Sequence, residues 1–366
     1  MAFFLPTLVV ALSASTRQMT TILGIGEMAG LAMLLIGRQL DRDRERSIIV
    51  ISLLLTGAGL LVATTGSLVV FAIGYVVIML AVSMCTVGGH TYLGRRVRFE
   101  RRARAIGTFE TSWAIALLVG APVAALLITR FGWRAPFIVF AAVAFVVALV
   151  LWIAEDHAVL LADAVNNDLA AKPRLTTPAW LTIAASAAIG ITGLTTVVIA
   201  GTWLDNAFGL STEGVGLIAM AFGAAELLAS SSSAVIADRI GPSRATRIAL
   251  MLAVVGLVVM TQAGSSLAVG ALGLFLFFVG FEFAIVTSFA VVSEAMPSAR
   301  GRVLSFNTAV STVVRGAGVA SSGVLYVAFG IAGPAVLSIT TAVIAVSLLV
   351  MAERTQRTVA NVTVDV

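Results

Sequence analysis

The sequence has few charged residues, a single cysteine and two histidines. Charged side chains make up 11% of its 366 positions and hydrophobic ones 60%, whereas a soluble domain carries roughly 25% charged residues. There are too few polar side chains to cover a soluble globule of this length. The high hydrophobicity also excludes a disordered chain. The sequence is therefore that of an integral membrane protein, and its long unbroken apolar runs predict helices rather than barrel strands.

The chemistry-bearing motifs of enzymes and ATP-driven pumps are also missing. One cysteine, Cys85, allows no disulfide framework and no thiolate metal cluster, and two histidines are too few for a histidine metal site. We find no G-x-x-x-x-G-K-[ST], H-E-x-x-H or G-x-S-x-G pattern. We therefore expect no enzymatic activity, no cofactor and no metal.

The net charge of +5 does not indicate a nucleic-acid partner. All but one of the 23 basic residues are arginines, and most lie in short loops between apolar runs, where membrane topology accounts for them. We expect the partners to be the lipid bilayer, a small-molecule substrate and protons, and the chain to be a monomer.

The apolar runs predict an all-α protein with twelve transmembrane helices, the first of them shortened. About 20 residues are needed to cross the hydrocarbon layer, so the first run is too short to span it. The expected explanation is a late start codon or a truncated first helix. A cleaved signal peptide is the alternative, although the basic n-region is missing. The runs are 1–14, 19–37, 47–65, 68–92, 106–128, 136–154, 179–200, 212–235, 246–263, 267–292, 304–328 and 332–352.

The basic residues predict the orientation. Nineteen of them follow the even-numbered runs, whereas Arg17, Arg130 and Arg134 lie on the other side. Since cytoplasmic loops carry the excess of arginine and lysine, we expect both termini in the cytoplasm. The Arg-rich composition fits the inner (plasma) membrane of a bacterium.

The two halves of the sequence resemble each other. Asp41-Arg42 returns as Asp238-Arg239 at an offset of 197, and Arg102 and Arg104 return as Arg300 and Arg302 at 198. Gly120 pairs with Gly318 at the same offset. These matches predict a tandem duplication with two parallel six-helix repeats. We expect an N-terminal half at 1–154, a cytoplasmic linker at 155–178, a C-terminal half at 179–352 and a cytoplasmic tail at 353–366.

Two motifs carry a resemblance to a known family. The segment from Gly37 to Arg46 resembles the loop signature G-x-L-A-D-R-x-G-R-K of the major facilitator superfamily, and the segment 234–241, with Asp238, Arg239 and Gly241, resembles its second copy. Gly120 and Pro122 resemble the Gly-Pro motif of the drug/proton antiporter branch, which includes arabinose-efflux-permease-like proteins. The run 68–92 lacks the membrane arginine of many such antiporters. The resemblance implies a transporter fold that covers nearly the whole chain.

Four charged residues are expected at bilayer depth, where a charge costs several kcal/mol and marks a cavity or a proton path. They are Glu27, Glu226, Glu282 and Arg315. One or more of the glutamates is expected to carry the coupling proton. Arg315 is expected either to fix a glutamate's charge or to bind an anionic group of the substrate. The alternative is structural: an inward Glu–Arg pair, or a protonated glutamate bonded to a neighbouring helix.

The resemblance also implies a cytoplasmic gate and a bent helix. Asp41 and Asp238 would cap facing helix N-termini, and the arginines Arg102, Arg104, Arg300 and Arg302 would pair with them across the halves. The alternative is that these arginines only set topology. Pro122 is expected to bend its helix by removing a backbone hydrogen bond.

Three hypotheses for the function follow. The first is a secondary active transporter that exports a small amphipathic compound in exchange for protons. The second keeps this fold but takes up a sugar or metabolite by proton symport. The third is a non-transporting membrane sensor or an inactive, truncated relic.

Overall fold

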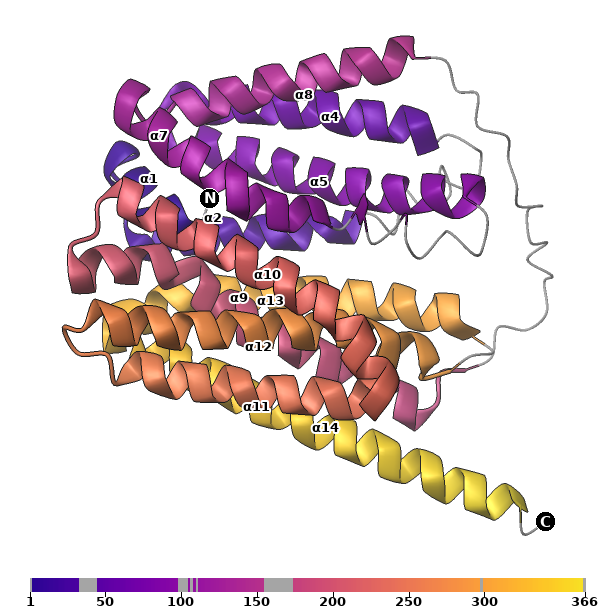
Figure 1. Cartoon of the computed structure of the whole chain (residues 1–366). Helices are drawn as coiled ribbons and strands as arrows, with labels where there is room; N and C mark the ends of the chain where they lie inside the picture. The colour runs from indigo at the N-terminus through magenta and orange to yellow at the C-terminus, as the bar shows by residue number, and fades with distance from the viewer. Residues whose placement is uncertain are drawn as a thin grey trace.

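The computed structural model is all-helical in the part of the chain it describes. The described residues are 2–32, 45–97, 105, 108–109, 111–154, 174–296 and 299–364. Figure 1 shows the helices running roughly side by side as one elongated bundle. The linker expected at 155–178 lies almost entirely outside the described residues.

Residues up to 153 form the first half of the bundle. A short 3₁₀ turn precedes α1, and the helix α2 continues into another such turn, η2. The α1–α2 junction is tight, with Ser13 at a φ of 47°. Ser15 then starts α2 through a capping box with Gln18. The elements are η1 (Ala2–Phe4), α1 (Leu5–Ala11), α2 (Thr16–Met28), η2 (Ala29–Ala32), α4 (Glu45–Val62), η3 (Ala63–Thr65), α5 (Leu68–Arg96), the π-helical η4 (Ala116–Gly120), α7 (Ala121–Phe131) and α8 (Ala135–Ile153).

The second half contains six long helices. Serine N-caps begin two of them, because the side chains of Ser211 and Ser266 accept hydrogen bonds from backbone N–H groups of the first turn. Gly209 ends α9 in the left-handed conformation, at a φ of 64°. The elements are α9 (Thr177–Phe208), α10 (Thr212–Ile240), α11 (Pro242–Thr261), α12 (Leu267–Glu294), α13 (Arg300–Phe329) and α14 (Ala332–Val364).

Ten of the described helices are long and apolar enough to cross a membrane. The count becomes eleven if α1 and the α2–η2 segment, which meet at a bend of 113°, form one broken span. The chain is therefore a multi-pass membrane protein by helix length and composition, and twelve spans stay a prediction. Figure 1 shows α14 extending past the other helices, through the segment expected to be a tail.

Equivalent helix pairs in the two halves cross at equivalent glycines. A Cβ built on Gly59 of α4 would lie 2.9 Å from the carbonyl oxygen of Gly74 on α5. A Cβ on Gly256 of α11 would lie 2.6 Å from the carbonyl oxygen of Gly273 on α12. Small residues at such crossings let two backbones approach closely. This repeated crossing supports the predicted duplication.

Helix α9 forms the centre of the second half. It packs against α12, α13 and α14, and hydroxyl groups join it to α14. Thr192 and Thr341 are 2.8 Å apart, and Thr196 and Ser338 are 2.9 Å apart, all four side chains being buried. Such interhelical hydrogen bonds satisfy polar groups that water cannot reach.

Candidate functional site

An ion pair joins the two halves near the middle of the bundle. Arg315 on α13 donates from Nη2 to Oε2 of Glu27 on α2 at 3.1 Å. The side chain of Glu27 is 17% exposed and that of Arg315 is 36% exposed. The sequence predicts Glu27 and Arg315 as individual charges, with an inward Glu–Arg pair as the structural alternative. The structure shows such a pair between these two residues.

Close backbone packing brings the helices of this ion pair together. Gly24 of α2 lies against Gly316 of α13, and Thr20 lies against Gly323 one to two turns farther along. On the other side of the ion pair, Gly30 faces Thr312. A larger side chain at these glycines would push α2 and α13 apart, so their small size is what allows Glu27 to reach Arg315.

A glycine on α9 makes room for the stem of Arg315. A Cβ built on Gly190 would lie 2.6 Å from Cγ and 2.8 Å from Cδ of Arg315. The arginine therefore passes over α9 at Gly190 and extends its guanidinium group toward α2. Its Nε is buried and has no hydrogen-bond acceptor among the described residues.

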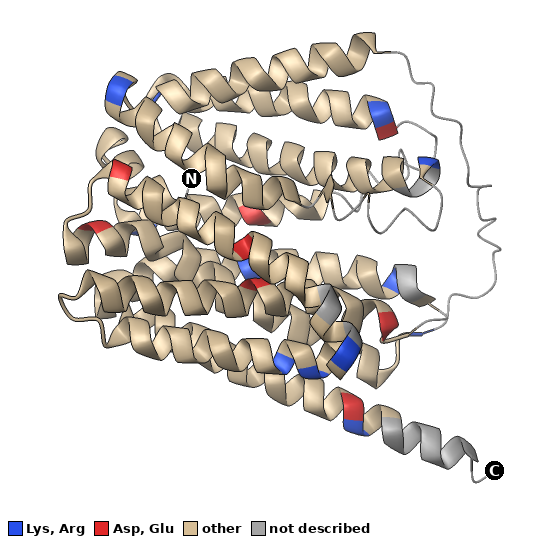
Figure 2. Cartoon of the chain, viewed as in Figure 1, with Lys and Arg blue, Asp and Glu red and all other residues tan. Residues whose placement is uncertain are grey.

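Glu226 on α10 and Glu282 on α12 are neighbours. Both are partly buried, and they lie close enough for their carboxyl groups to interact electrostatically. One helical turn before each glutamate, Phe222 and Phe278 stack with ring centroids 5.1 Å apart. Figure 2 shows a small group of acidic and basic residues in the middle of the bundle, whereas most other charges lie toward its ends.

The halves also meet away from this ion pair, among other places at η1 and at α10. Phe3 of η1 enters the core of the second half, where its ring lies 5.6 Å from that of Phe222 and its backbone touches Gly201 of α9. Helix α10 packs on η4 and α7, with Gly223 against Leu118 and Gly216 against Ala125.

A π-helical segment precedes Pro122, and the bend expected at this proline stays a prediction. Residues Ala116–Gly120 form η4, and the N–H of Ala121 bonds to the carbonyl of Ala116, five residues back. A π-bulge widens the helical turn, and Pro122 follows it at the start of α7. Gly120 has open space around it rather than a packed neighbour.

Half of the ten predicted gate residues lie outside the described residues. Gly37, Asp41, Arg42, Arg102 and Arg104 belong to this group, and the side chains of Asp238 and Arg300 are not described. Arg239 is exposed in the last turn of α10. Gly241, at a φ of 85°, separates α10 from α11. Arg302 lies over the ring of Phe306, 5.7 Å from its centroid.

A buried ion pair next to this motif was missed by the sequence analysis. Glu45, at the start of α4, is fully buried and pairs with Arg96 at the end of α5. Arg96 also lies 4.2 Å from the centroid of the Tyr92 ring. Arg46 donates to the carbonyls of Leu151 and Ala154 at the end of α8, where a cation is favoured. The signal available was an acidic residue inside an arginine-rich segment.

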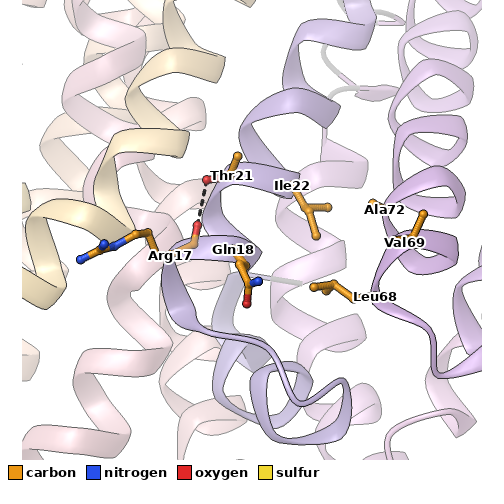
Figure 3. Close-up of a pocket in the computed structure, with 7 residues that line it drawn as sticks. All are labelled: Arg17, Gln18, Thr21, Ile22, Leu68, Val69 and Ala72. Atoms are coloured by element: carbon orange, nitrogen blue, oxygen red, sulfur yellow. Dashed lines mark hydrogen bonds between the residues drawn. The ribbon is translucent and has the colours of Figure 1, made fainter.

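A shallow pocket of about 440 Å³ opens between the first turns of α2 and α5. Figure 3 shows its lining, in which the Thr21 hydroxyl donates to the carbonyl of Arg17 at 2.8 Å. None of the residues predicted to act in transport lines this pocket. Its lining is Arg17, Gln18, Thr21, Ile22, Leu68, Val69 and Ala72.

Comparison of the sequence with models of known protein families identifies the family of the chain. The sequence profile of the Major Facilitator Superfamily matches residues 1–319. The chain belongs to this superfamily. It is a family of transporters and not of enzymes, and the drug/proton antiporter branch remains a prediction.

The similarity to individual members of the superfamily is low in sequence. In an alignment of 278 residues that covers 72% of the chain, it is 26% identical to the protein named uncharacterized MFS-type transporter YwfA of Bacillus subtilis (strain 168). The match covers 65% of YwfA, so the chain spans about two thirds of the length of this curated relative. Activity, substrate and partners are therefore proposals.

Solved structures share the fold. Two are of a bacterial homologue of the human lysosomal transporter Spinster, in inward-facing conformations. The unoccupied one has a TM-score of 0.75 and the occupied one 0.72, both at 16% identity. Both alignments cover 96% of this chain. They cover 91% of the chain in the unoccupied structure and 94% of the chain in the occupied one.

Proposed function

We propose that this superfamily member is a secondary active transporter that exports a small amphipathic compound in exchange for protons. The observation that carries the proposal is the Glu27–Arg315 ion pair, which links α2 and α13 across the two halves in a setting otherwise composed of apolar helices. A charged contact between two bodies that pack through small residues can form and break as the bodies rock. That motion exposes the space between them alternately to the two sides of the membrane.

Glu226 and Glu282 are the proposed proton carriers. Two neighbouring carboxyl groups share a partly buried site, and protonating one of them removes the repulsion between two like charges. The stacked rings of Phe222 and Phe278, both buried, lie one helical turn from this acidic pair and make its surroundings apolar. Exchange of a proton for the amphipathic compound at this place would couple the two fluxes.

The predicted gate would close the cytoplasmic side. Asp41, Arg42, Asp238 and Arg239, with the arginines at 102, 104, 300 and 302, are proposed to bind across the halves at that side. The buried Glu45–Arg96 pair and the Arg46 contacts to α8 would hold the helices that flank this gate.

The test uses everted membrane vesicles with an acidified interior and a pH-sensitive dye. Lipophilic drugs, sugars and amino acids are added one at a time. Recovery of dye fluorescence on addition of one compound is expected, because export in these vesicles carries protons out of the interior. Substrate-dependent alkalinisation of the medium by whole cells would instead indicate uptake by symport.

Matched variants make the test specific. Glu226→Gln is expected to abolish recovery although the protein inserts normally. Glu213→Gln is the control, since Glu213 is an exposed residue in the first turn of the same helix. Equal recovery in Glu226→Gln, Glu282→Gln and wild type would refute the assignment of the proton carriers.

A further inference from the structure

A row of polar side chains runs along one face of α13. Asn307, Ser311 and Arg315 are spaced four residues apart, which places them on one face with a rise of about 6 Å per step. Asn307 is only 4% exposed. Its Oδ1, the Oγ of Ser311 and the Nε of Arg315 are buried without a hydrogen-bond partner among the described residues.

This polar row faces the interior of the bundle. Val313 and Val324, 39% and 43% exposed, lie on the opposite side of α13 from Arg315. The polar side faces α9, where Gly190 touches Arg315 and Thr195 lies beside Gly318. Arg315 then reaches across to Glu27 on α2.

Arg315 has unused hydrogen-bonding capacity. A guanidinium group carries five N–H donors in a planar fork that matches a carboxylate in a two-point contact. Among the described residues, one bond from Nη2 to Glu27 is formed, and the side chain is 36% exposed. The exposed part of the Arg315 side chain can therefore be reached by a solute.

We propose that Arg315 binds the carboxylate of an amphipathic organic anion, which replaces Glu27 as its partner. The oxygens of Ser311 and Asn307, buried in this structure, accept hydrogen bonds from polar groups of the same solute when the two halves part. This inference rests on the proposed transport function and narrows its substrate class. While no solute is bound, the Glu27 carboxylate is the ion-pair partner of Arg315.

Gly190 is a positioning residue in this site. Because its missing side chain leaves room for the stem of Arg315, Gly190→Ala displaces the guanidinium without removing any charge. The matched control is Gly214→Ala, at a helical glycine where an added Cβ would make only ordinary contacts, 3.4 Å or longer.

The test measures salicylate binding to the full chain, purified in detergent, by the shift of its thermal unfolding midpoint with salicylate concentration. A ligand that binds only the folded state raises this midpoint, so the titration yields an apparent Kd. Salicylamide, a neutral analogue of similar shape, is the ligand control. Salicylate is expected to stabilise the wild type, and salicylamide is not.

The variants are expected to change the apparent Kd for salicylate in opposite directions. Arg315→Gln should weaken salicylate binding by about tenfold or more, as expected for the loss of a charged hydrogen bond. Glu27→Gln should tighten it, because the competing carboxylate is gone. Gly190→Ala should weaken it, whereas a merely structural role would lower the midpoint without changing Kd. Asn307→Leu should weaken binding of salicylate less than Arg315→Gln does.

A second Arg–Glu pair supplies matched controls. Arg247 and Glu353 join α11 and α14 at 3.2 Å within one half, so Arg247→Gln and Glu353→Gln should leave Kd unchanged. Unchanged binding in Arg315→Gln, weaker binding in Glu27→Gln, or no salicylate response in the wild type and Glu27→Gln would each overturn the proposal. The assay needs no transport, so its failure is distinct from failure of the vesicle experiment.

Discussion

Gly24 of α2 and Gly316 of α13 meet backbone to backbone where the two halves of the molecule cross. A Cβ built on Gly316 would lie 2.6 Å from the carbonyl oxygen of Gly24 and equally close to Cγ of Met28. This crossing is one turn from Glu27, so it sets the distance between Glu27 and Arg315.

Gly24→Leu is therefore expected to separate α2 from α13. Overpacking of this kind costs about 1–3 kcal/mol, and the loss should appear as a lower thermal unfolding midpoint of the purified protein. The same change at Gly214, where an added Cβ would make only ordinary contacts, should have a much smaller effect. Equal midpoints for the two variants would contradict the close crossing.

The buried pair of Glu45 and Arg96 is expected to behave as a unit. Removing one partner leaves an uncompensated buried charge, which costs about 3–5 kcal/mol. Glu45→Leu and Arg96→Met should each destabilise the protein strongly, whereas the double variant should recover most of the loss. Thermal unfolding of the four proteins measures this coupling. Additive losses would show that the two side chains do not depend on each other.

The buried hydroxyl pair of Thr192 and Thr341 should contribute little. Hydrogen bonds between membrane helices average about 0.6 kcal/mol in double-mutant cycles. Thr192→Val alone leaves the hydroxyl of Thr341 bonded only to the carbonyls of its own helix, so a loss of this order is expected. A loss of several kcal/mol would mean that the pair has a larger role in holding α9 to α14.

Glu282→Gln is expected to abolish proton-driven transport while the protein still inserts. The amide cannot take up and release a proton in the relevant pH range, but it keeps the shape of the side chain. Glu294→Gln, an exposed change at the end of the same helix α12, is the control. Vesicle dye recovery and membrane yield are compared, and retained recovery in Glu282→Gln would remove this residue from the proton path.

The helices could be predicted from the sequence because hydrophobic run length is a local property. The runs at 47–65 and 136–154 correspond to α4 with η3 and to α8 within two residues. The same counting predicts that Glu27 and Arg315 lie at bilayer depth, and an inward Glu–Arg pair was one alternative, but it does not say which glutamate Arg315 contacts. Glu27 and Arg315 are 288 positions apart, and only the crossing of α2 and α13 brings them together.

Other features depend on packing and leave no periodic signal. In the sequence, Gly190 looks like any other small residue of a membrane helix. Only the structure shows that the stem of Arg315 packs on it. Glu45 is an acidic residue within an arginine-rich segment, but that pattern gives neither its partner nor its burial. Its burial follows from the position of Arg96 at the end of α5.

The central claim is that the two halves part and rejoin during transport. Thr20 and Gly323 touch across the halves, so cysteines at both positions, in a Cys85→Ser background, can be joined by oxidation. The measurement is transport, in vesicles, of the compound found in the dye screen, before oxidation, after it and after reduction. We predict that transport stops when the cross-link forms and returns when it is reduced, with either single cysteine unaffected. Full transport by fully cross-linked protein would contradict the account.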